Sequence, residues 1–125
     1  MAGPTPFDLW LGERYREGGA FTMLIVLVRI GELEVDLLRS THLHVIGDET
    51  SWRELTRLFE GAKVPWNGAA FFEADPVAGL VEDPNAKLLL SDLVARLHEN
   101  RLVLNDGHFF DKQGRRLRID EATAH

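Results

Sequence analysis

The segment from Phe21 to Ile30 constrains the fold of this chain more than any other segment. Apart from Thr22 and Arg29, its residues are apolar, and several of them are β-branched. A continuous apolar run of this kind is typical of a strand that is covered on both faces. We therefore expect a buried strand here, with other parts of the chain packed on its two sides.

Two further strands are predicted after Gly31, which interrupts the apolar run. The segment 33–37 alternates apolar with acidic residues, and this period of two indicates a half-exposed strand. The segment 41–46 places His42 and His44 on one face and apolar residues on the other. Short connections between the three strands favour an antiparallel meander.

Two main amphipathic helices are predicted beyond these strands. Ser51 and Glu54 have the spacing of a capping box, in which each side chain satisfies a free backbone N–H, and this helix should run over 51–61. Asp83 has the position of a cap for the second helix, over 84–98, whose leucines form an apolar stripe. Both helices are expected to pack on the sheet.

The N-terminal segment predicts a third, shorter helix. Thr5 is suited to cap it, Pro6 suits its first position, and the glycine pair after Glu17 ends it. Because Met23 is an alternative translation start, residues 1–20 are either an appendage or a packing element of the fold.

Four short segments complete the expected sheet: 69–73, 102–105, 108–110 and 117–120. Asp106 and Gly107 are typical of a hairpin turn between the second and third of these segments. The sequence thus predicts an α+β fold, with an antiparallel or mixed sheet of about six strands. Residues 1–125 are expected to form a single domain.

Composition narrows the classes of protein to which the chain can belong. It has no cysteine, which excludes a disulfide framework, a thiol nucleophile and a zinc–thiolate site, and which fits a reducing cytoplasm. A net charge of −6 disfavours nonspecific binding to nucleic acid. The longest apolar run, Met23 to Val28, is far shorter than the ~20 residues of a membrane helix. We therefore expect a cytoplasmic protein that binds neither nucleic acid nor a membrane.

His42 and His44 are the candidate metal ligands. Residues two apart on a strand project from the same face, so both imidazoles can reach one ion, with Glu49 as a third ligand. The His-x-His followed by Glu is similar to the metal motif of the cupin barrels, whose pattern would continue with a strand where this sequence predicts the helix over 51–61. The alternative interpretation is a pair of histidines on an exposed strand face without a metal ion.

Aromatic residues form the second group of candidates. Within 71–72 and within 109–110, adjacent phenylalanines point to opposite faces of their strands. Either both faces of the sheet are covered, or one face carries an exposed apolar patch of the kind that marks a binding surface. The candidate binding residues are Trp66, Phe72, His108 and Phe110.

The chemistry-bearing residues do not form a convergent catalytic set. No serine lies in a Gly-x-Ser-x-Gly motif, and no glycine-rich phosphate loop is present, so no cofactor is predicted. Acidic residues prevail over 47–85 and basic ones over 101–120, and such segments can complement each other between molecules. We therefore expect a non-enzymatic protein-interaction or homo-oligomeric module that binds another protein or itself. The alternative is a small ligand- or metal-binding enzyme that uses His42 and His44, with His108 near Trp66.

Overall fold

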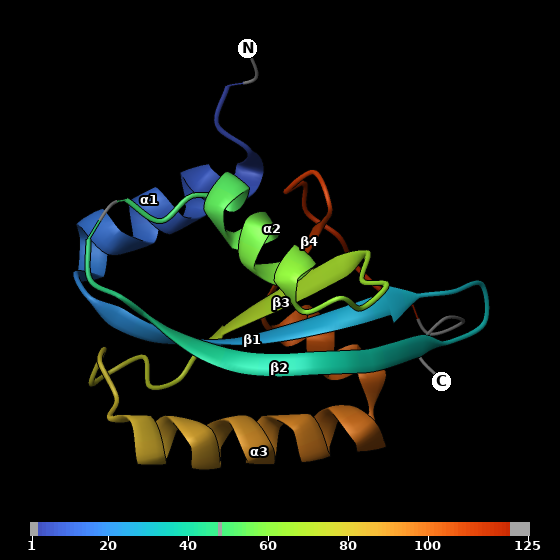
Figure 1. Ribbon diagram of the computed structural model, residues 1–125. Coiled ribbons are helices and arrows are strands. Elements are labelled where there is room, and N and C mark those ends of the chain that lie inside the picture. The colour runs from blue at the N-terminus through green and yellow to red at the C-terminus, as the bar shows by residue number, and fades with distance from the viewer. Residues whose placement is uncertain (1–2, 48, 121–125) are drawn as a thin grey trace.

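One antiparallel sheet organises the part of the chain that the computed structural model describes, residues 3–47 and 49–120 (Figure 1). The strand order is β2-β1-β3-β4, and every pair of neighbours is antiparallel. The strands are β1 (Phe21–Ile30), β2 (Val35–Val45), β3 (Gly68–Glu73) and β4 (His108–Asp111). The helices are α1 (Pro6–Gly18), α2 (Trp52–Gly61), α3 (Asp83–Glu99) and a 3-10 helix, η1 (Arg101–Asp106).

β1 is an inner strand, and both of its faces are covered, as its apolar sequence predicts. Helices α1 and α2 lie on one face of the sheet, and α3 lies on the other (Figure 1). Met23 and Ile25 belong to the apolar core on the side of α1 and α2, whereas Leu24 and Val26 belong to the core on the side of α3. The predicted strand over 21–30 is therefore confirmed.

The predicted helix over 51–61 is confirmed as α2. Its N-cap is Ser51, whose hydroxyl accepts a hydrogen bond from the Glu54 N–H at 3.3 Å. Leu55 and Phe59 are buried against the sheet, as the amphipathic pattern requires.

Helix α1 is an integral part of the core. A complete capping box starts it: the Thr5 hydroxyl accepts from the Asp8 N–H at 3.1 Å, and the Asp8 carboxylate accepts from the Thr5 N–H at 2.9 Å. Phe7 is fully buried, with its ring centroid 4.8 Å from that of Trp52 and 4.7 Å from that of Phe71. The helix thus packs against both α2 and β3.

Within the described residues, no helix combines the length and the apolar composition that crossing a membrane requires.

The sheet has four strands, rather than the expected six or so. The strands expected at 33–37 and 41–46 form one continuous strand, β2. Leu38 is an extra residue between Leu37 and Arg39, which pair with successive residues of β1. A bulge of this kind shifts the alternation of side chains by one residue, so the apolar residues of the two halves of β2 alternate with the same period but out of phase relative to the faces of the sheet. The sequence therefore suggested two strands where there is one.

Of the short strands expected in the second half of the chain, those at 69–73 and 108–110 are confirmed as β3 and β4. The strand expected at 102–105 is wrong, because these residues lie in η1 and no hairpin precedes β4. The Asn100 side chain accepts a hydrogen bond from the Leu102 N–H at 3.0 Å and so starts a turn. This local bond favours the 3-10 helix over an extended segment.

The strand expected at 117–120 does not join the sheet as a named strand. Asn105 takes the place of a strand partner there: its side chain accepts from the Ile119 N–H at 2.9 Å and donates to the Ile119 carbonyl at 2.7 Å. An isolated bridge between Phe110 and Arg116 keeps the segment beside β4.

Helix α3 begins one residue earlier than expected, and the prediction that Asp83 caps it is wrong. The N-cap is Glu82, whose side chain makes no capping bond, and Asp83 lies in the first turn. The Asp83 carboxylate instead contacts two histidines of β2, and hydrogen bonds with imidazoles replace the local bond to the backbone.

Candidate functional site

Strand β2 carries the candidate site. The two predicted metal ligands lie on its face toward α3, and a cavity opens on its face toward α2. β2 is also the end strand of the sheet, so its outer edge has no strand partner within the described residues. These three features lie within one strand of 11 residues.

His42 and His44 project from the same face of β2, as their spacing predicts. His42 pairs with Leu24 of β1, which belongs to the core on the side of α3, and His44 pairs with Thr22. The centroids of the two imidazole rings are 5.4 Å apart. Both side chains are partly covered, His42 more than His44.

Asp83 completes the cluster from the N-terminal turn of α3. One of its carboxylate oxygens, Oδ1, lies 2.6 Å from Nε2 of His44 and 3.0 Å from Nε2 of His42. Hydrogen bonds from His44 and then from His42 hold the pKa of Asp83 below its ordinary value. The carboxylate is therefore an anion near neutral pH, and 63% of its side chain is exposed to solvent.

Thr22, on the neighbouring strand β1, contacts the cluster through His44. It is the one buried polar or charged residue of the described chain, and its hydroxyl lies 2.8 Å from Nδ1 of His44. The same hydroxyl accepts a hydrogen bond from the Val81 N–H at 2.9 Å. Because residue 81 is two positions before Asp83, a single hydroxyl links one histidine to the loop that delivers the carboxylate.

The cluster has the donor atoms of a metal site. His42, His44 and Asp83 each offer one ligand atom, and these atoms lie within 4.8 Å of one another. Glu49, the expected third ligand, is exposed and is not a member of this group within the described residues. Two imidazole nitrogens and one carboxylate oxygen suit zinc and its neighbours in the first transition series.

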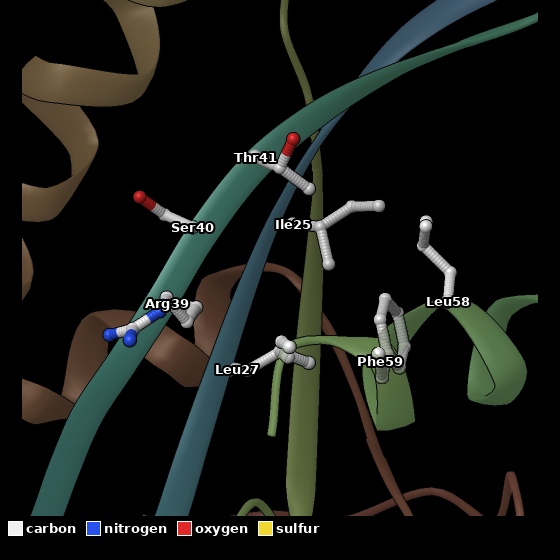
Figure 2. A pocket seen from close by; sticks show the side chains of 9 residues that line it. Ile25, Leu27, Arg39, Ser40, Thr41, Leu58 and Phe59 are labelled. Carbon is white, nitrogen blue, oxygen red and sulfur yellow. The ribbon is translucent and has the colours of Figure 1, made fainter. Parts of the chain in front are cut away.

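The cavity on the other face of β2 has a volume of about 450 Å³, within the range of ligand-binding pockets. It lies between the sheet and α2, where Ile25 and Leu27 face Phe59 and Leu58 (Figure 2). Its β2 wall is the exposed middle of the strand, residues 39–41. The lining is mainly apolar, so the cavity suits an aliphatic or aromatic group.

A second hollow lies on the α3 side of the same stretch of β2. It has a volume of about 310 Å³, and Ser40 forms its β2 wall. The other lining residues belong to α3: Lys87, Leu90, Ser91 and Val94. The middle of the edge strand is thus flanked by a hollow on each face.

The predicted aromatic candidates are distributed through the core. Trp66 and Phe110 are buried on the side of α1 and α2, and Phe72 packs against the core on the side of α3. The Trp66 indole N–H is buried without a hydrogen-bond partner in the described chain. These residues therefore do not form a continuous exposed patch, and a binding role for them stays a prediction.

His108 lies away from the other histidines. Its ring stacks on that of Trp10 with centroids 4.2 Å apart, and its Nδ1 lies 3.0 Å from Nη1 of Arg116. Burial, and then the positive charge of Arg116, hold the pKa of His108 below its ordinary value of 6.5, while Glu73 opposes the shift. The structure does not bring His108 into the cluster formed by His42 and His44.

Sequence reasoning missed one member of the cluster, Asp83, and the residue that supports it, Thr22. Asp83 was interpreted as a helix cap, and Thr22 as a polar exception within a buried strand. Asp83 is 39 residues from His44 along the chain, so only the packing of α3 on the sheet brings them together. The one available signal was the hydroxyl of Thr22 within an apolar run, since a buried polar group requires a partner.

Comparisons with known proteins add no family to this geometry: no family model, curated protein or solved structure matches the chain.

Proposed function

We propose that this domain is a protein-interaction module that binds an extended segment of another polypeptide by strand addition to β2. The observation that carries the proposal is the outer edge of β2, which has no strand partner among residues 3–47 and 49–120 and is flanked by a hollow on each face. In strand addition, main-chain hydrogen bonds supply affinity, and pockets for alternate side chains supply specificity.

The two edges of the sheet differ in a way that supports this proposal. β4, at one end, has four residues, and the segment after it follows it closely: the Leu117 N–H donates to the Phe109 carbonyl at 2.8 Å. β2, at the other end, has 11 residues, and residues 39–41 in its middle are exposed. Long, open edge strands are otherwise avoided, because they pair with other chains.

The flanking hollows specify the kind of segment that would bind. An added strand would send alternate side chains to the two faces of the sheet. On the α2 side, the cavity would receive an apolar side chain against Leu58 and Phe59. On the α3 side, Lys87 lines the hollow, and Arg39 lines the cavity on the opposite face. These two cations favour acidic residues next to the apolar one.

The test begins with a display library of random peptides of about eight residues, a common length for a strand. We expect enrichment of extended sequences that combine an apolar residue with acidic ones, and the selected peptide is then made synthetically. Its binding to the full chain is measured by fluorescence anisotropy. A version N-methylated at alternate peptide bonds has the same side chains but lacks donors, so we expect it to bind at least tenfold more weakly.

Leu58→Asp is the matching change in the protein. It places a charge at the mouth of the apolar cavity, so we expect a tenfold or greater loss of peptide affinity. Leu9→Asp on α1 is the control, because Leu9 is 60% exposed and Leu58 is 57% exposed. Equal binding by both variants, or by the N-methylated peptide, would contradict the proposal. A wild-type dimer that Leu58→Asp converts to a monomer would identify a second copy of the chain as the partner.

A further inference from the structure

We propose that His42, His44 and Asp83 form a binding site for a divalent transition-metal ion of the zinc type. The site lies on the α3 face of β2, whereas the apolar cavity opens on its α2 face. The inference does not depend on the proposed function, and the two can fail separately.

The positions of the ligand atoms fit an ion after a small movement. Zinc lies about 2.0–2.2 Å from nitrogen and oxygen ligands, which places neighbouring ligands of a tetrahedral site about 3.3 Å apart. Oδ1 of Asp83 is now 2.6 Å from one Nε2 atom and 3.0 Å from the other. Entry of an ion therefore requires Oδ1 to separate from each nitrogen by less than about 1 Å, and the two imidazole ligand atoms, which lie within 4.8 Å of each other, to come to about 3.3 Å. The exposed Asp83 side chain has the freedom to make that movement.

The buried hydroxyl of Thr22 prepares His44 to act as a ligand. This hydroxyl lies 3.4 Å from the Val81 carbonyl, to which it donates, and it accepts from the Val81 N–H. Without an ion, Nε2 of His44 donates to Oδ1 of Asp83, so binding of an ion at Nε2 would move the remaining imidazole proton to Nδ1. The free lone pair of the hydroxyl, 2.8 Å from Nδ1, would then accept the Nδ1–H. Metal-bound histidines commonly donate their other N–H in this way.

The donor set identifies the class of ion. Calcium and magnesium prefer sites built from oxygen ligands, and this cluster offers only one carboxylate. Two neutral imidazoles and one carboxylate suit zinc, cobalt or nickel. Three protein ligands leave a fourth position for water or for an incoming group, and the exposure of Asp83 gives that position access to solvent.

The test uses the full chain after removal of metal by a chelator. We expect one equivalent of Co²⁺ to give visible absorption bands of a low-symmetry site, and one equivalent of Zn²⁺ to displace it. Isothermal titration with Zn²⁺ should give a stoichiometry of one. His42→Ala, His44→Ala and Asp83→Asn should each weaken Zn²⁺ binding by tenfold or more, whereas His98→Ala, an exposed histidine of α3, should leave it unchanged.

Thr22 is tested as a positioning residue. Thr22→Val removes the hydroxyl while preserving the shape, and loss of such a support typically lowers metal affinity 10- to 100-fold. Thr22→Ser retains the hydroxyl and should restore both the affinity and the Co²⁺ spectrum. This rescue separates a role in orienting His44 from a general loss of packing, and circular dichroism verifies that each variant is folded.

Three results would overturn the site: no Co²⁺ spectrum with the wild type, Zn²⁺ binding that survives in the His42→Ala/His44→Ala double variant, or equal weakening by His98→Ala. Peptide binding measured in the presence of the chelator tests the proposed function without any metal. Metal binding and peptide binding are therefore measured separately, so failure of one proposal does not decide the other.

Discussion

At the scale of single residues, the histidines that the structure describes illustrate how packing assigns different chemistry to identical side chains. His42 and His44 share one carboxylate, whereas His108 stacks on Trp10 and faces the cationic Arg116. The sequence predicted that His42 and His44 lie on one face, because the period of a strand determines it. It did not predict Asp83 as their partner, because that contact depends on how a distant helix packs.

The environment of His108 predicts a dependence of stability on pH. Its pKa is lowered in the folded state, so as the pH falls below 6.5 the unfolded chain takes up the proton first. The contribution of neutral His108 to the free energy of unfolding is therefore fully present above pH 6.5 and is lost progressively as the pH falls below it. His108→Gln cannot titrate, so its free energy of unfolding should fall less than that of the wild type between pH 7.5 and pH 5.5.

Urea denaturation at the two pH values measures this difference. All other titrating groups are the same in both proteins, so the comparison isolates His108. An identical fall in both proteins would show that the folded state does not disfavour the protonated ring.

At the scale of secondary-structure elements, an ion pair connects α1 to β3. Nη2 of Arg14 lies 2.6 Å from Oε1 of Glu73, and both side chains are largely covered. The Arg14 guanidinium also lies 4.2 Å above the ring of Phe21, so it contacts β1 as well. The sequence predicted α1 from its cap, its first-turn proline and the glycine pair that ends it. It left open whether residues 1–20 pack on the sheet, since that depends on contacts such as this one.

Glu73→Gln should destabilise the protein by about 1–3 kcal/mol, because it weakens a partly buried, charge-assisted hydrogen bond. Asp36→Asn is the control, since the ion pair between Arg29 and Asp36 is exposed and should contribute less than about 1 kcal/mol. Urea denaturation of the three proteins gives both values. A loss for Asp36→Asn as large as that for Glu73→Gln would contradict the stabilising role of the α1 contact.

The elements that the sequence predicted well are those with strong local patterns. β1 has a continuous apolar run, and α2 has both a cap and an amphipathic face. Those predicted wrongly are short or irregular: η1 is set by the side chain of Asn100, and β2 contains a bulge at Leu38. In the first case a side-chain hydrogen bond favours a turn, in the second an extra residue shifts the phase of the alternation, and the apolar pattern alone does not record either effect.

At the scale of the whole molecule, the arrangement of helices and sheet explains why we propose peptide binding at an edge of the sheet rather than on one of its faces. Helices cover both faces of the sheet, so the predicted aromatic candidates are mainly core residues (Figure 1). Because β4 is followed closely by the segment after it, β2 presents the longer open edge in the described structure. The apolar run over 21–30 predicted that β1 is covered on both faces, but strand order decides which edge is open, and the sequence did not give that order.

The most direct test of binding at β2 is amide hydrogen exchange of the full chain, with and without the selected peptide. Strand addition would pair the outward-facing N–H groups of residues 37–44, so we expect exchange in that segment to slow on peptide binding. Exchange of β4, at the opposite edge, should remain unchanged. If the peptide slowed exchange at another surface and left β2 unaffected, β2 would not be the binding edge.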